Sequence, residues 1–178
     1  ATGQAQRRQD FGPFVDGFVE FPHCTCYRCP YDKTYGNCDI ECARKVEDII
    51  LNEGADTVGG LIVEPITAGG GILFPVKEYY PILQEICKKY DIWLIMDEVV
   101  TGFRVHPGGA QGLLDVKPDL TTLAKILAGG LPGGAVVGRA DILEHLDFKA
   151  AAEKDFEKIH HPGTFNGNPL SAAAGTKT

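Results

Sequence analysis

Two side chains with complementary chemistry, Asp97 and Lys125, each follow an apolar run of the sequence. Asp97 comes directly after the five apolar residues 92–96, and Lys125 stands between PDLTTLA and the glycine-rich stretch ILAGGLPGG. A carboxylate at the edge of an apolar layer needs a partner. An amine shielded by apolar residues and glycines can attack a carbonyl and form a Schiff base. The pair therefore indicates a reactive amine with an acidic partner.

This combination is typical of enzymes that use pyridoxal phosphate. Those enzymes need a lysine for the Schiff base and an acid beside the pyridinium nitrogen. Asp97 would keep that nitrogen protonated, and Lys125 would move the proton of the substrate Cα. Structural roles are also open: Asp97 can cap a helix or pair with Lys125 or Arg104, and Lys125 can extend from a strand end into solvent.

The segments that would position these residues alternate between strand and helix patterns. Short apolar runs predict four strands, within residues 57–65, 91–98, 118–125 and 133–139. Apolar residues at helical spacing predict helices within residues 39–54 and 75–90. Residues 1–38 are rich in Pro, Gly and Cys and show no period, so we expect an irregular connection there.

The strand runs lack polar alternation, which favours an α/β fold with a mostly parallel sheet and helices on both faces. In such sheets, ligands bind beyond the carboxyl ends of the strands. The residues that stand at those ends are Glu64, Asp97, Glu98 and Lys125. We therefore expect the candidate chemistry to gather at one edge of the sheet.

Composition limits the remaining possibilities. The chain has 178 residues, 44% of them hydrophobic, with a formal net charge of −7. This predicts a packed core and argues against nucleic acid or an anionic membrane as partner. No apolar run is long enough to span a bilayer and no signal peptide is evident, so we expect a cytoplasmic protein. The sequence has no initiator Met and ends inside a predicted helix, so we expect both ends to be truncated.

Five of the six cysteines cluster within residues 24–42. Their spacing, C-x-C-x2-C followed by C-x3-C, differs from the paired C-x2-C pattern of common zinc sites. The cluster could still bind zinc or an iron–sulfur centre, or form disulfides in an exported protein. We favour reduced thiols on a partly buried loop, because the cytosol keeps thiols reduced. Three histidines, His106, His160 and His161, lie beside prolines and read as ordinary loop residues.

Four motifs in order along the chain resemble the class III aminotransferases of pyridoxal phosphate fold type I. They are LIMDEVVTGFR, PDLTTLAK, GGLPGGAVVGR and HPGTFNGNPLSAAAG. Two stretches, GFRVHPGGAQG and HPGTFNGNPL, are most similar to the glutamate-1-semialdehyde aminomutase-like branch. Two others, CYRCPYDKTYGNCDIEC and EPITAGGGILFP, resemble other class III transaminases and dialkylglycine-decarboxylase-like members. The resemblance covers nearly the whole chain.

The resemblance implies a role for individual residues. Lys125 matches the lysine that forms the Schiff base, and Asp97 the acid on the pyridine nitrogen. Val99 matches the apolar residue against the ring, and Thr164 a threonine that binds the cofactor phosphate across a homodimer interface. The resemblance also implies that a run of glycines beside the lysine allows close backbone approach: Gly129, Gly130, Gly133 and Gly134. Thr164 also has a plain structural interpretation, as a turn residue before a helix capped by Asn168.

Two positions depart from many ω-transaminases. Val100 stands where a glutamine binds the ring hydroxyl, and Gly69 stands where a glutamate pairs with the substrate arginine. Val100 agrees with the aminomutase branch, and Gly69 weakens γ-aminobutyrate or ornithine as a substrate. By resemblance, residues 1–178 are a partial large domain. The N-terminal phosphate-binding region and the C-terminal small domain lie outside the chain.

The resemblance implies pyridoxal-phosphate-dependent transamination between an amino donor and an oxo acid or aldehyde. An aminomutase or a decarboxylase would use the same residues, so these alternatives remain open. From other classes, a metal-binding module built on the cysteines and a catalytically silent fragment remain alternatives.

Overall fold

The computed structural model describes residues 3–178, which form two compact units. One unit comprises residues 3–59 and Ile66–Ile92, and the other comprises Gly60–Pro65 and Trp93–Thr178. All four strands belong to the second unit. The first unit holds the two longest helices and the cysteine cluster.

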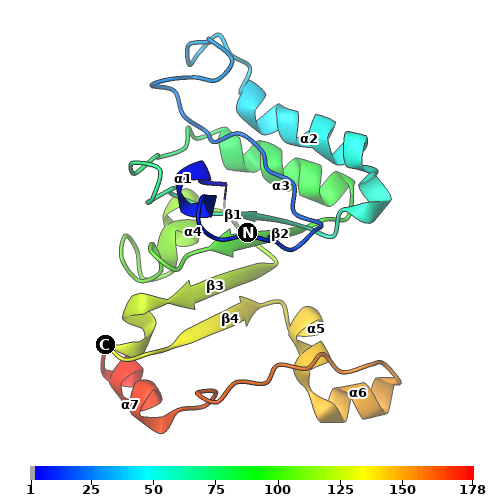
Figure 1. Cartoon of the computed structure of the whole chain (residues 1–178), viewed down its shortest axis with the longest axis vertical. Helices are drawn as coiled ribbons and strands as arrows, with labels where there is room; N and C mark the ends of the chain where they lie inside the picture. The colour runs from blue at the N-terminus through cyan, green and yellow to red at the C-terminus, as the bar shows by residue number, and fades with distance from the viewer. Residues whose placement is uncertain (1–2) are drawn as a thin grey trace. The chain divides into compact units, whose positions relative to one another are not determined.

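A four-stranded sheet in the order β1-β2-β3-β4 organises the second unit (Figure 1). The strands are Gly60–Val63 (β1), Trp93–Asp97 (β2), Leu120–Ala124 (β3) and Gly134–Gly138 (β4). The first three run parallel and β4 runs antiparallel to β3. A parallel crossover needs a dozen or more residues, and residues 125–133 are too few for one. The fold is thus α/β with a mixed, mostly parallel sheet, as the sequence predicted.

The strands are less buried than their apolar sequences predicted. Leu61, Leu94 and Met96 are buried, but Ile62 is 46% exposed and Trp93 is 42% exposed. Along β4 only Ala135 is partly buried. Burial therefore alternates along β1 and β2 in the described chain.

Asp119 joins the starts of β2 and β3 to the end of β4. Its Oδ2 accepts a hydrogen bond from the Leu94 amide at 2.8 Å, and its own amide donates to the Leu94 carbonyl at 2.8 Å. Arg139, directly after β4, donates from Nη1 to Asp119 Oδ1 at 2.7 Å. These contacts hold β2, β3 and β4 together opposite the edge where Asp97 lies.

The rest of the second unit consists of short helices. They are α4 (Gly109–Leu114), the 3-10 helix η2 (Lys125–Ala128), α5 (Ala140–Leu143), η3 (Glu144–Leu146), α6 (Phe148–Lys154) and α7 (Pro169–Lys177). Asn168 caps α7, because its Oδ1 accepts from the amides of Leu170 and Ser171, with Pro169 in the first turn. The predicted cap of this helix is confirmed.

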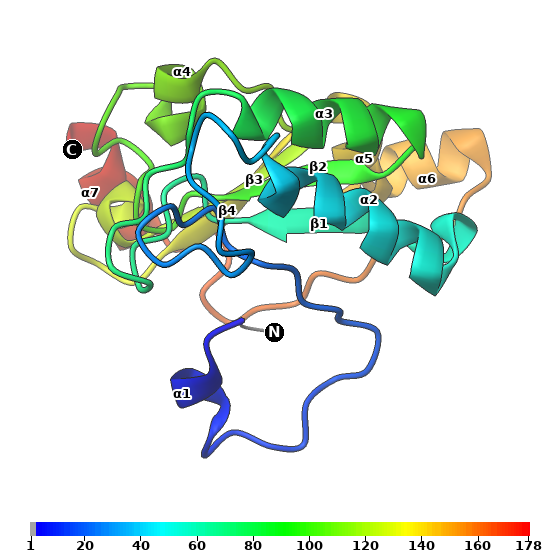
Figure 2. The same cartoon turned by 90° about the horizontal axis from the view of Figure 1, so that it is seen from above.

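In the first unit, α2 (Glu41–Glu53) and α3 (Tyr79–Lys89) lie side by side (Figures 1 and 2). Each buries one apolar face, which includes Val46 and Ile50 on α2 and Leu83 on α3. A polar contact joins their exposed sides, where Glu47 accepts from Lys89 Nζ at 2.6 Å and from the Tyr90 hydroxyl at 2.7 Å. Both predicted helices are confirmed.

Apart from α2, α3 and η1 (Ala55–Thr57), this unit is largely irregular. The described part of residues 1–38 contains only the four-residue helix α1 (Ala5–Arg8). No helix among the described residues is long and apolar enough to cross a membrane.

Candidate active site

Asp97 is the last residue of β2 and is half-buried. Its Oδ1 accepts a hydrogen bond from the Val99 amide at 3.0 Å, which orients the carboxylate within a tight turn. Among residues 3–178, no ion pair joins Asp97 to Lys125 or Arg104 and no hydrogen bond to Oδ2 is found. The turn occupies one carboxylate oxygen and leaves the other for a further donor.

Lys125 follows β3 directly and opens η2. The register pairs Asp97 with Thr122 on the neighbouring parallel strand, so Lys125 lies three residues beyond that partner at the same edge. Its side chain is exposed, so the shielding by apolar residues and glycines that the sequence suggested is not present, and its φ of 50° lies in the left-handed region. Eight other non-glycine residues of the described chain also have a positive φ, so this conformation does not by itself mark Lys125 as functional.

Glu98 is a site residue to which the sequence assigned no role. Its side chain is only 1% exposed. Oε2 accepts from Thr101 Oγ1 at 2.9 Å and from the Ala110 amide at 2.6 Å. Oε1 accepts from the Gln111 amide at 2.9 Å and from Gln111 Nε2 at 3.0 Å. A buried carboxylate is tolerated when its oxygens are satisfied in this way.

Glu98 ties the segment after Asp97 back to the start of α4. Its own amide donates to the Thr122 carbonyl of β3 at 3.0 Å, so the same residue also holds the two strand ends together. Gly109 makes the approach possible, because a Cβ there would lie 2.3 Å from Glu98 Oε2 and its φ is +70°. The visible signal in the sequence was a second carboxylate at the end of an apolar run. Its partners at Ala110 and Gln111 could not be foreseen, because they lie 12 and 13 residues away along the chain.

Of the four glycines expected to allow close backbone approach, only Gly129 meets the backbone of α7, whereas nothing lies within 4 Å of a Cβ at Gly130. A Cβ at Gly129 would lie 2.9 Å from the Ala174 carbonyl, and a Cβ at Gly175 would lie 2.3 Å from the Leu127 carbonyl. Gly129 also has a φ of +59°. The close packing of α7 on η2 therefore fixes the segment that Lys125 begins.

The remaining predicted residues divide into two groups. Val99 is half-buried in the turn with Asp97, and Val100 beside it is exposed. Thr164 lies on an exposed turn before α7, and no hydrogen bond between described residues joins it to Asp97 or Lys125. One edge of the sheet thus holds Asp97, Val99 and Lys125. No hydrogen bond links Thr164 to this group among the described residues.

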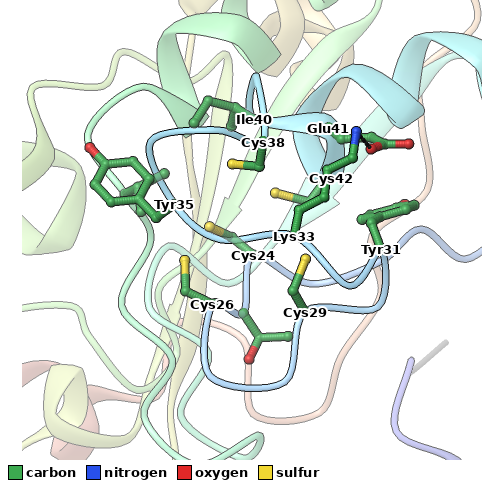
Figure 3. Close-up of a pocket in the computed structure, with 12 residues that line it drawn as sticks. Cys24, Cys26, Cys29, Tyr31, Lys33, Tyr35, Cys38, Ile40, Glu41 and Cys42 are labelled. Carbon is green, nitrogen blue, oxygen red and sulfur yellow. Dashed lines mark ion pairs between the residues drawn. The ribbon is translucent and has the colours of Figure 1, made fainter.

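The cysteine cluster lines a cavity of about 20 Å³ in the first unit. Figure 3 shows the sulfur atoms of Cys24, Cys26, Cys29, Cys38 and Cys42 around a shared space. All six cysteines are free thiols. Within residues 3–178, no group of three or more His, Cys, Asp or Glu side chains is arranged to hold a metal ion. The metal-binding hypothesis therefore has no support from the described geometry.

Comparison with known proteins identifies the class. The pattern of the family described as Aminotransferase class-III matches residues 1–178, and the chain therefore belongs to the class III aminotransferases.

Individual relatives include both transaminases and aminomutases. The chain is 40% identical to a hypotaurine/taurine–pyruvate aminotransferase of Paracoccus denitrificans over 93% of the chain and 36% of the relative. It is 46% identical to a glutamate-1-semialdehyde 2,1-aminomutase of Methanocaldococcus jannaschii over 72% of the chain and 28% of the relative. The chain thus spans roughly a third of the length of these relatives.

Solved structures confirm the fold. A transaminase from directed evolution by ancestral reconstruction superimposes with a TM-score of 0.87 at 33% identity, covering 98% of this chain and 38% of that one. The ω-transaminase of Pseudomonas jessenii in complex with PMP gives a TM-score of 0.85 at 26% identity, with the same coverage of both chains.

Proposed function

We propose that this chain carries the lysine-bearing part of a pyridoxal-phosphate-dependent aminotransferase. The enzyme moves an amino group between an amino donor and an oxo acid or aldehyde. The observation that supports the proposal is that Asp97 and Lys125 lie at the same edge of adjacent parallel strands. Membership of the class III family supports it.

The residues at this edge have the chemistry that the cofactor requires. Pyridoxal phosphate, when bound, supplies an aldehyde that condenses with a lysine amine and a ring that draws electrons from the substrate Cα. Lys125 presents an exposed amine that is in no ion pair among the described residues. Asp97 retains one carboxylate oxygen for a protonated ring nitrogen. The donor set therefore fits the cofactor.

Each side chain at the edge has a separate task. Asp97 would hold a proton on the ring nitrogen of the cofactor, because its carboxylate stabilises the positive charge. Lys125 Nζ would take up the Cα proton of the substrate and pass it on to the cofactor carbon. Val99, fixed two residues after Asp97, provides an apolar contact for a flat ring. Glu98 keeps the turn and both strand ends in place through its buried hydrogen bonds.

The relatives indicate a substrate class. Several relatives are named for taurine or hypotaurine as donor and pyruvate as acceptor. We therefore propose a small oxo acid as acceptor. An aminomutase remains the second candidate, because Val100 agrees with that branch and a glutamate-1-semialdehyde aminomutase is 46% identical over 72% of the chain.

We further propose that residues 1–178 form part of a large domain in a longer protein. The phosphate-binding region and the small domain with a carboxylate-binding arginine would come from the remaining sequence. The protein would work as a homodimer in which Thr164 reaches the cofactor of the partner. The exposed position of Thr164 on a turn supports this role.

Addition of pyridoxal phosphate to the chain tests the proposal. We expect a visible absorption band of lysine-bound cofactor that is lost in Lys125→Ala and kept in Lys117→Ala. Lys117 is a suitable control because it is also an exposed lysine of the second unit. An equal band in wild type and Lys125→Ala would contradict the assignment of Lys125. A band that a donor amine then bleaches would show transfer, whereas an unchanged band would identify a chain that binds cofactor without turnover.

A further inference from the structure

The cysteine cluster lies outside the proposed active site and is used by no step of the proposed reaction. Its five thiols come from the loop before α2 and from the first turn of that helix. They surround one small cavity rather than pointing into solvent separately (Figure 3). A cavity of about 20 Å³ has room for about one water-sized molecule.

Two of the thiols that line this cavity, Cys24 and Cys42, come from different segments of the chain. The side chains of Cys24 and Cys42 share a hydrogen bond, although the residues lie on different segments, the loop and α2. Cys24 is buried, with 9% of its surface exposed, and Cys42 is half-buried. The shared cavity therefore gathers thiols of the loop and of α2 before any bond joins them.

The surroundings make Cys24 the more reactive member of the pair. The hydrogen bond from Cys42 lowers the pKa of the Cys24 thiol to about 6 against the opposing effect of burial, with further help from the Val76 amide and from Cys26. The pKa of Cys42 is raised, chiefly by the same hydrogen bond and by burial. The exposed Cys26 also has a raised pKa, because of burial of its sulfur and the neighbouring thiols. The thiolate is the form that reacts with oxidants.

We propose that Cys24 and Cys42 form a peroxide-sensitive dithiol, a modification site in which Cys24 is oxidised and Cys42 resolves it. The Cys24 sulfur attacks one oxygen of hydrogen peroxide, the O–O bond breaks, and one water leaves, which gives a sulfenic acid. The Cys42 sulfur then attacks the Cys24 sulfur, the S–O bond breaks, and a second water leaves with the Cys42 proton. Two thiols lose two electrons to form one disulfide, and the peroxide is reduced to two waters.

The product would link the loop covalently to the first turn of α2. Exposure alone would instead predict modification at Cys26, since Cys26 is the exposed cysteine of the cluster and Cys24 is buried. The two expectations differ in which residue reacts, so they can be separated by experiment.

Peptide mapping after peroxide treatment tests the proposal. Trypsin separates residues 9–28, which contain Cys24 and Cys26, from residues 34–44, which contain Cys38 and Cys42. We expect these two peptides to be linked after the chain is treated with hydrogen peroxide, and released by dithiothreitol. Fragmentation of the linked peptide should assign the bond to Cys24 and Cys42.

Serine variants provide the matched controls. The link should be lost in Cys24→Ser and in Cys42→Ser, and it should persist in Cys26→Ser and Cys38→Ser. Far-ultraviolet circular dichroism checks that each variant folds. Fragmentation of the linked peptide from the wild-type chain tests the same pairing without any substitution. A link that survives in Cys24→Ser or Cys42→Ser would overturn the proposal, as would peroxide modification of Cys26 without any link. The test is independent of cofactor binding.

Discussion

Asp97 and Lys125 carry the proposed chemistry, and their roles differ enough to be separated by substitution. Lys125 would form the covalent link, whereas Asp97 would act only through charge. The turn that orients Asp97 depends on the Val99 amide and Asp97 Oδ1. An asparagine at position 97 can keep that hydrogen bond while losing the negative charge.

For Asp97→Asn we therefore expect cofactor still attached to Lys125 but slow reaction with a donor amine. Loss of a charge that stabilises the transition state costs about 100-fold or more in rate. Stopped-flow measurement of the decay of the visible band on addition of donor provides the rate. Asp115→Asn is a matched control, because Asp115 is an exposed residue at the end of α4. If Asp97→Asn reacts as fast as Asp115→Asn, Asp97 has no electrostatic role.

The sequence was informative about Asp97 and Lys125 because each stands at the carboxyl end of a strand that its apolar run predicted. In a parallel sheet the strand ends meet at one edge, so two local patterns were enough to bring the residues together. Glu98 stands in the same pattern, but its role depends on Thr101, Ala110 and Gln111. Those partners are defined only by the path of the chain after β2, which periodicity does not reveal.

Among the elements, the connection from β2 to α4 depends most on a single side chain. We expect Glu98→Ala to lower the free energy of unfolding by about 3 kcal/mol, because buried amides of α4 lose their acceptor. Glu98→Gln, which keeps one acceptor oxygen, should cost less. Urea unfolding provides the comparison, with Glu153→Ala on the exposed surface of α6 as the control. Equal stabilities of Glu98→Ala and Glu153→Ala would contradict the anchoring role.

The contact between α2 and α3 should depend on pH. Hydrogen bonds from Lys89 and Tyr90 lower the pKa of Glu47. A carboxylate with a lowered folded-state pKa stabilises the fold above its unfolded pKa, and this contribution is lost as the pH falls through the folded value. Glu47→Gln should therefore lower the urea midpoint at neutral pH and have little effect in acid. Glu53→Gln, at the exposed end of α2, is the control.

A difference between Glu47→Gln and wild type that stays constant from neutral pH into acid would contradict this account. The helices themselves were predictable, since apolar residues recur at helical spacing in both. Their polar contact was not, because Glu47 and Lys89 lie 42 positions apart in the sequence.

For the whole molecule, the resemblance in four ordered motifs anticipated the family that the comparisons then established. The antiparallel direction of β4 was not specified by its apolar run and follows from the short connection after Lys125. The exposure of strand residues such as Ile62 and Val136 could not be predicted, because a strand covered on both faces would have the same apolar run. The short length of the strands could not be predicted for the same reason. The homodimer, the cytoplasmic location and the role of Thr164 stay predictions.

Reductive trapping of the cofactor tests the central claim most directly. The chain is incubated with pyridoxal phosphate, treated with borohydride and digested, and the modified peptide is identified by mass spectrometry. We predict that the phosphopyridoxyl group is found on Lys125, and that Lys125→Ala carries no label above the background of its exposed lysines. A label spread evenly over the surface lysines, or concentrated on a lysine away from the edge shared with Asp97, would contradict the account.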